Sequence, residues 1–305
     1  MTGLTSVVTR RLLAIIPTML AASFVVFCLL RIVPGDPVDA LAAEGGISEE
    51  RAAQLRQEMG LTLPIPLQYG WWLGGALQGD LGVSLRSDFR VGWLIWQALP
   101  RTAALAGQAI LIGLLVGIPL AFAAVAWPRS PISTLATVIS TVSVAVPGFA
   151  IAICGLLVFA VWLRLLPATQ SVILPAFVLG LDFAGTLIRF LRADLETQVG
   201  ADYVRTALAM GHARRIVLFR HVARNALVTG ITVLGLAFGN LLTGATIIET
   251  IFDWPGIGLL AIDAIRARDY PVVQGAILFM ALAFAIVNAL ADILYAAADP
   301  RIRLD

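Results

Sequence analysis

Six long runs of apolar residues divide this 305-residue chain and limit what it can fold into. The shortest run has 20 residues, which as a helix rise about 30 Å, the thickness of the hydrocarbon core of a bilayer. Apolar residues make up 59% of the chain and charged residues 13%, whereas soluble domains average roughly 45–50% and 25%. We therefore expect an all-α membrane protein with six transmembrane helices. The expected spans are 12–33, 102–126, 135–163, 172–191, 227–250 and 274–298.

The first and third runs need separate interpretation. Arg10 and Arg11 precede the first run, as in a secretory signal peptide. Its 22 residues exceed the 7–15 apolar residues typical of a cleaved signal, so we expect a retained anchor. In the third run, Pro147-Gly148 predicts a kink.

The distribution of arginine predicts the orientation of the spans. With the N-terminus in the cytoplasm, the inner connecting segments carry 11 Arg and 5 acidic residues, and the outer ones carry 8 Arg and 11 acidic residues. The net charges are therefore +6 inside and −3 outside. Because cytoplasmic loops are enriched in basic residues, both termini are expected in the cytoplasm, with the chain in the plasma (inner) membrane.

The residue types exclude several kinds of chemistry. All 21 basic residues are Arg, and both the phosphate-binding P-loop and Schiff-base chemistry need a Lys. Cys28 and Cys154 lie inside apolar runs, which argues against a disulfide framework or a zinc site. A net charge of +2 does not indicate nucleic-acid binding. We expect no catalytic residue, no metal and no cofactor bound by this chain.

The segment 34–101 is too long to be a simple connection between two helices. It opens with the turn sequence Pro34-Gly35-Asp36-Pro37. Ser48 is a predicted N-cap of a helix that reaches about Met59, with Gly60 just beyond its end. This external loop is either a structured cap without a ligand of its own or a docking surface for an external partner. Trp71 and Trp72 within it belong either to its core or to the membrane interface.

The segment 192–226, called here the charged segment, carries six arginines among small residues. Gly211 separates an Ala-rich stretch from one in which Ile216, Val217 and Phe219 fall at helical spacing. A loop that contacts anionic lipid would explain the arginines. It would not explain the small residues and the central glycine, which favour a pair of short helices that bind in the cleft of another protein.

Three acidic residues lie inside or at the ends of predicted spans, where ionisable groups are costly. Asp182 lies in mid-span, with Thr186 one turn further along. It either makes a structural hydrogen bond to another helix or lines a substrate path. Glu249 is expected at the external mouth as a gate or docking residue, and Asp292 is expected to anchor helices. Gly235 and Gly239 form a small-residue face suited to close helix contact, either within the chain or against another membrane protein.

The charged segment resembles the EAA loop of permease subunits of ATP-binding-cassette (ABC) importers. In that loop, small residues and a glycine form a helix that couples the permease to an ATPase. Arg205-Thr206-Ala207 and Gly211 occupy that pattern here, although Met210 stands where the family usually has a basic residue. Motifs along most of the chain resemble the first permease of the dipeptide, oligopeptide and nickel branch. They include Gly79-Asp80-Leu81-Gly82, Leu99-Pro100-Arg101-Thr102, Trp254-Pro255-Gly256-Ile257-Gly258, Pro271-Val272-Val273-Gln274-Gly275 and Asp299-Pro300-Arg301-Ile302-Arg303.

This resemblance implies a type I importer permease fold with three parts. These are an N-terminal segment and first helix (1–33), an external loop (34–101) and a five-helix core (102–305). It implies a second homologous permease as a heterodimer partner, two cytoplasmic ATPase subunits that use ATP and Mg²⁺, and an external substrate-binding protein. The residues expected to couple to an ATPase are Asp202, Tyr203, Arg205, Thr206, Ala207, Gly211, Arg214, Arg220 and His221.

Two other functional classes fit less well. A metalloprotease needs paired histidines at helical spacing, but His212 and His221 are nine residues apart. A channel or secondary transporter would leave the charged segment unexplained. Peptides, nickel or its chelates, glutathione and opines are all substrates of permeases that this chain resembles. Short peptides are the expected substrate.

Overall fold

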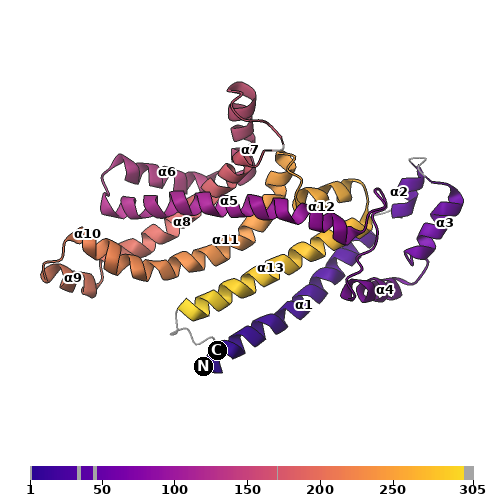
Figure 1. Ribbon diagram of the computed structural model, residues 1–305, viewed down its shortest axis with the longest axis horizontal. Coiled ribbons are helices and arrows are strands. Elements are labelled where there is room, and N and C mark those ends of the chain that lie inside the picture. The colour runs from indigo at the N-terminus through magenta and orange to yellow at the C-terminus, as the bar shows by residue number, and fades with distance from the viewer. Residues whose placement is uncertain (1, 33–35, 44–46, 170, 299–305) are drawn as a thin grey trace. The chain divides into compact units, whose positions relative to one another are not determined.

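The computed structural model describes the chain except for residues 1, 33–35, 44–46, 170 and 299–305. For some helical residues, many of them between 225 and 243, it describes the backbone alone. The described residues form helices joined by turns (Figure 1), with one isolated bridge between Val83 and Arg90. The turn at Pro34-Gly35 and the motif 299–303 lie outside the described residues. The helices are α1 (Thr2–Ile32), α2 (Pro37–Ala43), α3 (Glu49–Glu58), α4 (Ile65–Leu77), α5 (Val91–Ala126), α6 (Pro131–Ala145), α7 (Gly148–Gly155), η1 (Leu156–Trp162), α8 (Ile173–Val199), α9 (Asp202–Ala209), α10 (Arg214–Ile216), η2 (Val217–Val222), α11 (Ala223–Ile251), α12 (Ile257–Arg266) and α13 (Tyr270–Ala298).

Among the residues that the structure describes, four helices are long and apolar enough to cross a membrane, and the bent pair α6 and α7–η1 makes a fifth if it counts as one span. The four are α1, α5, α8 and α13. The remaining predicted span, 227–250, coincides with the 29-residue helix α11, whose side chains are described only in part. Multi-span membrane architecture is therefore confirmed. Several helices extend beyond their apolar runs: α5 begins at Val91 rather than near residue 102, and α8 continues to Val199.

The kink predicted at Pro147-Gly148 is a full break, because the two helices meet there at 111°. Val146 is extended (φ −110°, ψ 123°), and Pro147 caps the start of α7 without a side-chain hydrogen bond. A proline disfavours helical geometry in the residue before it and has no N–H to continue the hydrogen-bond ladder. Local chemistry therefore explains the break, whereas its angle depends on the contacts of each half.

By its internal contacts the chain forms two compact units. Unit 1 comprises residues 1–12, 103–254 and 286–305, and unit 2 comprises residues 13–102 and 255–285. Each is described by itself below.

Helix α8 is the centre of unit 1 and packs against α6 and α11. One face of α8 is buried, including Phe183, Leu187 and Leu195. Two glycines bring neighbouring helices close: a Cβ on Gly180 would lie 2.7 Å from Ile112 of α5, and one on Gly185 would lie 2.1 Å from the Ser143 hydroxyl of α6. In a membrane the hydrophobic effect does not drive helices together, so helices associate through close packing, which small residues allow.

Two expected helix contacts are found within unit 1. Asp292 of α13 pairs with Arg11 of α1 at 3.1 Å, which confirms that it anchors helices. A Cβ on Gly235 of α11 would lie 2.7 Å from the Cβ of Ala291 of α13. At Gly235 the small-residue face therefore serves packing within the chain.

Unit 2 contains the external loop, which is folded. Ser48 caps α3 as predicted, since its hydroxyl accepts a hydrogen bond from the Arg51 amide at 3.3 Å. Gly60 ends the helix in a left-handed conformation (φ +64°). Arg56 donates hydrogen bonds to Asp36 and Asp39, which raise the pKa of its guanidinium.

A buried carboxylate joins the two parts of unit 2. Asp269, which is 3% exposed, accepts hydrogen bonds from the Ser84 hydroxyl at 2.5 Å and the Leu85 amide at 3.2 Å. The Ile257 amide donates to the Thr102 hydroxyl at 2.8 Å. Val91, Ile95 and other apolar residues of early α5 pack with α12 and early α13 in one core. These contacts explain why α5 begins before its apolar run.

Candidate functional site

The charged segment of unit 1 folds as two short helices around Gly211. α9 ends in a Schellman motif, in which the Gly211 amide donates to the Leu208 carbonyl at 3.0 Å and the His212 amide donates to the Ala207 carbonyl at 3.2 Å. Gly211 has φ +87°, which a residue with a Cβ adopts only at a cost. The predicted helix–glycine–helix is confirmed, and the glycine sets the sharp turn between its halves.

The second half of the segment runs continuously into α11. α10 passes into the π-helical turn η2 and then into α11. Val217, Leu218 and Val222 of η2 pack against Leu191 and Leu195 of α8 in one buried cluster. The same cluster holds Ala121, Val125, Val204, Ala207 and Ala226. The segment is therefore attached through an apolar core to α5, α8 and α11, all of which are membrane-length helices.

The structure separates the predicted coupling residues into exposed and buried groups. Ala207 is 5% exposed and packs inward beside Val204, so it is part of the core and is not on the outer surface. The others are exposed: Asp202, Tyr203, Arg205, Thr206, Gly211, Arg214, Arg220 and His221. Asp202 lies in the first turn of α9, where a negative charge is favoured, and pairs with Arg205 at 3.6 Å. This pair is open to solvent and contributes little to stability.

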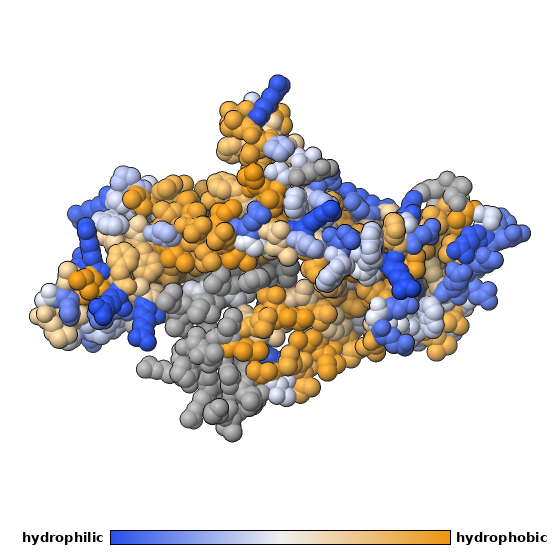
Figure 2. Space-filling view, viewed as in Figure 1, coloured by the Kyte–Doolittle hydropathy of each residue, from blue (hydrophilic) through white to orange (hydrophobic). Residues whose placement is uncertain are grey.

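Apolar side chains that the sequence analysis did not select share this surface. Met210 is 68% exposed and Leu208 is 42% exposed. Phe219 is also largely exposed and stacks on Phe122 with ring centroids 5.7 Å apart. Figure 2 shows hydrophilic side chains gathered around α9 and α10. A cavity of about 340 Å³ opens beside these helices, lined by Leu208, Arg214 and other residues of the segment and of α5. Mixed apolar and basic surface of this kind suits a protein partner.

The two acidic residues expected in a path or gate lie in different surroundings. Asp182 of α8 is partly buried, and no hydrogen bond or ion pair reaches its carboxylate within the described part of the chain. Glu249 is completely buried next to Ile248, a member of the core cluster around α8 and α11. Its side chain therefore offers no exposed docking surface in this structure.

The two histidines lie near each other. The rings of His212 and His221 are 6.1 Å apart, on either side of α10. Two imidazoles alone do not complete a metal site, and the described residues contain no cluster of three or more His, Cys, Asp or Glu side chains able to hold an ion.

The apolar spans define a multi-pass membrane protein, and the charged segment attached to them is largely exposed. Residues 109–304 match the family of inner membrane components of binding-protein-dependent transport systems. Residues 4–106 match the model of the N-terminal part of the membrane component of the same systems. The chain belongs to this family of membrane permeases, and membership implies a partner ATPase and a substrate-binding protein.

Similar proteins support this family over the full length. A putative peptide transport system permease protein of Brucella abortus (strain 2308) is 37% identical over 319 residues, covering 99% of this chain and all of the relative. The glutathione transport system permease protein GsiC of Escherichia coli O6:H1 is 35% identical, covering 97% and 98%. A chain of the inward-facing MetNI methionine ABC transporter has a similar fold, with a TM-score of 0.54 at 13% identity, covering 68% of this chain and 97% of that one.

Proposed function

We propose that this chain is one of two homologous permease subunits of an ATP-driven importer of short peptides in the plasma (inner) membrane. Two ATPase subunits would bind on the cytoplasmic side, and an external binding protein would deliver the substrate. ATP and Mg²⁺ would be used by the partner chains and not by this one. The arginine distribution supports cytoplasmic termini and a cytoplasmic position for the charged segment.

The charged segment is the proposed contact with an ATPase. Its exposed face combines charged and polar side chains with the apolar Leu208 and Met210. Its inner face is packed on α8 through Val204 and Ala207. A partner that moves the outer face would therefore move α8 and α11 with it. ATP-dependent closure of the ATPase would shift the spans between inward-open and outward-open states, because the closed ATPase binds these two states of the permease with different affinity.

Asp182 and Glu249 take different roles in this proposal. Asp182, with no partner for its carboxylate among the described residues, is the better candidate for a group that lines the path. Glu249 is the candidate for a gate, since opening a path beside it would expose a carboxylate that is fully buried here.

The substrate class rests on similarity to peptide permeases across 99% of the chain. Glutathione is a second candidate, because a glutathione permease is 35% identical over nearly the same length. Short peptides and glutathione, the two candidate substrates, share peptide bonds and free carboxylates.

Uptake by the assembled transporter tests the proposal. The chain is co-reconstituted in liposomes with its partner permease and ATPases, and the binding protein is added outside. We expect ATP-dependent accumulation of a radiolabelled dipeptide, with glutathione and Ni²⁺ as alternative substrates in parallel. Accumulation of glutathione alone would replace dipeptides by the second candidate, and accumulation of nickel alone would overturn the peptide assignment. Accumulation of any of them without ATP would overturn the importer mechanism.

A further inference from the structure

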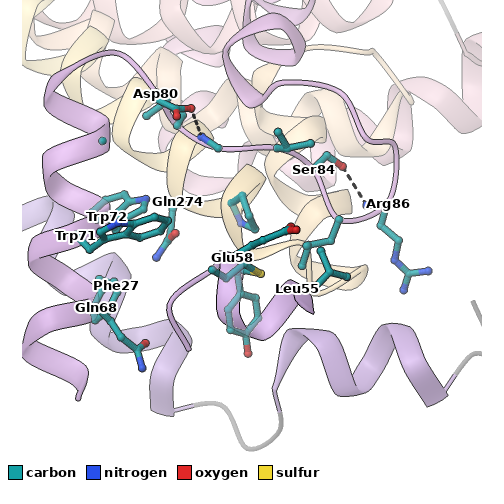
Figure 3. A pocket seen from close by; sticks show the side chains of 18 of the residues that line it. Phe27, Leu55, Glu58, Gln68, Trp71, Trp72, Asp80, Ser84, Arg86 and Gln274 are labelled. Carbon is teal, nitrogen blue, oxygen red and sulfur yellow. Dashed lines mark hydrogen bonds between the residues drawn. The ribbon is translucent and has the colours of Figure 1, made fainter. Parts of the chain in front are cut away.

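Unit 2 contains a cavity of about 950 Å³ that the proposed coupling function does not use. It is lined by the end of α1, by α3 and α4 of the external loop, and by the start of α13. Figure 3 shows Trp71 and Trp72 on one wall, with Leu55 and Glu58 facing them and Gln274 close by. Its volume is at the upper end of the range for small-molecule sites, roughly 300–1,000 Å³.

Four buried polar atoms have no hydrogen-bond partner within the described part of the chain, and all four belong to residues that line this cavity. They are Arg31 Nε, Gln68 Oε1, Trp72 Nε1 and Tyr270 Oη. Gln68 is 7% exposed and Tyr270 is 4% exposed. Because buried polar groups are nearly always paired, four unpaired ones around one cavity indicate a site that is completed by a ligand.

Neighbouring contacts hold three of these groups in place. The Gln68 amide nitrogen donates to the carbonyls of Leu61 (3.1 Å) and Leu63 (2.7 Å), which fixes the orientation of the amide and leaves Oε1 as the unpaired atom. The Arg31 guanidinium lies 5.1 Å from the centre of the Phe27 ring. The Trp72 indole packs against Phe27 and Tyr69. The four unpaired atoms themselves are covered by neighbouring atoms in this structure, so a ligand in the cavity bonds to them only after lining side chains move aside.

The unpaired atoms define the chemistry of the ligand. Three are donors, and one of these, on Arg31, is cationic, so they suit the oxygens of a carboxylate. Gln68 Oε1 is an acceptor and needs an N–H from the same ligand. The whole lining carries three arginines and three acidic residues, namely Arg31, Arg51, Arg86, Glu58, Asp80 and Asp88. Because these charges balance, the cavity disfavours a dianion such as phosphate and suits a ligand that carries one negative and one positive group.

The rest of the lining is apolar and aromatic. Phe27, Leu55, Met59 and Trp71 contribute to the walls. A ligand that fits has a carboxylate, an N–H donor, a positive group and an apolar side chain. A short peptide with free ends and an apolar residue has all of these.

We propose that this cavity is a binding site for the free carboxyl end of a short peptide, in which Arg31, Trp72 and Tyr270 bind the carboxylate and Gln68 accepts a hydrogen bond from a peptide N–H. The site deepens the proposed function, on which it rests, by giving the external loop a direct contact with substrate.

Equilibrium binding to the assembled transporter tests this site. The complex of permeases and ATPases is placed in lipid nanodiscs without the external binding protein, and the binding of radiolabelled alanyl-phenylalanine is measured. We expect saturable binding that is at least about tenfold weaker for the C-terminal amide of the same dipeptide. Arg31→Gln is expected to weaken binding of the free acid by about tenfold or more, because it removes a charge-assisted hydrogen bond.

A matched pair of tyrosine variants separates binding from folding. Tyr270→Phe removes a hydroxyl that has no partner, so it should weaken peptide binding several-fold and leave the thermal unfolding temperature unchanged. Tyr69→Phe removes a hydroxyl that bonds to Ser23 at 2.9 Å and does not line the cavity. Because phenylalanine keeps the ring that packs on Trp72, Tyr69→Phe should lower the unfolding temperature and leave peptide binding unchanged.

Three outcomes would overturn the site: no saturable binding of the dipeptide, binding insensitive to both Arg31→Gln and Tyr270→Phe, or equal competition by octanoate, a carboxylate without N–H groups. ATP-driven peptide uptake is measured on the same preparation. Uptake that persists without binding to the nanodisc complex overturns this site alone, whereas absence of peptide uptake by the wild-type complex contradicts the proposed function.

Discussion

Single residues decide how closely the helices of unit 1 approach. Gly185 is the clearest case, because a Cβ there would lie 2.1 Å from the Ser143 hydroxyl, 2.5 Å from its Cβ and 3.0 Å from the Ile139 carbonyl. The last contact is with backbone, which a rotamer change cannot relieve. By contrast, Gly107 of α5 has nothing within 4 Å of its Cβ position. Glycine is therefore required at the first position and not at the second.

We expect Gly185→Ala to destabilise the protein by about 1–3 kcal/mol, because it forces α8 away from α6. Ser143→Gly in the same chain should recover part of this loss, since it removes the two nearest atoms. The measurement is thermal unfolding of the purified chain in nanodiscs. Gly107→Ala, the matched control, should be neutral or slightly stabilising. Equal unfolding temperatures for Gly185→Ala and wild type would contradict the close contact.

At the scale of elements, the charged segment has a buried side and an exposed side with different roles. Both sides carry residues of the motif that resembles the EAA loop. Ala207 belongs to the buried side and supports the packing of α9 on α8. Met210 and Leu208 belong to the exposed side. A change on one side therefore alters folding, and a change on the other alters contact with a partner.

Charged substitutions on the two sides should give different results. Met210→Glu should leave stability within about 0.5 kcal/mol of wild type but reduce ATP-driven uptake several-fold, because it places a charge in the proposed contact. Ala207→Glu buries an unpaired carboxylate and should lower the amount of folded protein. Uptake per folded transporter and the yield of monodisperse protein are measured together.

Leu165→Glu is the matched control for Met210→Glu, since Leu165 is also 68% exposed but lies outside the charged segment. It should leave uptake unchanged. Normal uptake by Met210→Glu would show that this face of the segment does not bind an ATPase.

At the scale of the whole molecule, the central question is how the chain crosses the membrane. The bent pair α6 and α7–η1 is decisive, since its 111° break fits either a broken span or a re-entrant loop. The arginine distribution predicts that residues 127–134 lie inside and residues 164–171 lie outside. The pair should therefore cross the membrane.

Cysteine labelling in whole cells tests this crossing. The background carries Cys28→Ala and Cys154→Ala, and single cysteines are introduced as Arg129→Cys and Thr169→Cys at exposed positions that flank the pair. A membrane-impermeant maleimide should label Thr169→Cys in intact cells and Arg129→Cys only after the membrane is opened. Labelling of both from the same side would identify a re-entrant loop.

Features that depend on neighbouring residues in the chain could be predicted from the sequence. The apolar runs, the Ser48 cap and the turn at Gly211 all follow from local hydropathy or backbone chemistry, and the structure has each of them. The helix α12 was missed, because its ten residues lie in a segment that carries no long apolar run. The inward position of Ala207 was also missed, since a motif identifies a residue without saying which face is buried.

The sequence alone determined that this chain is a multi-span helical protein with a structured charged segment, because hydropathy and turn chemistry act over a few residues. Only the tertiary structure decided which polar atoms are left without partners. Arg31 of α1, the pair Gln68 and Trp72 of α4, and Tyr270 of α13 come from three distant parts of the chain, and no local pattern relates those parts. They line one cavity because helices from three parts of the chain fold together around it, and burial depends on that long-range packing.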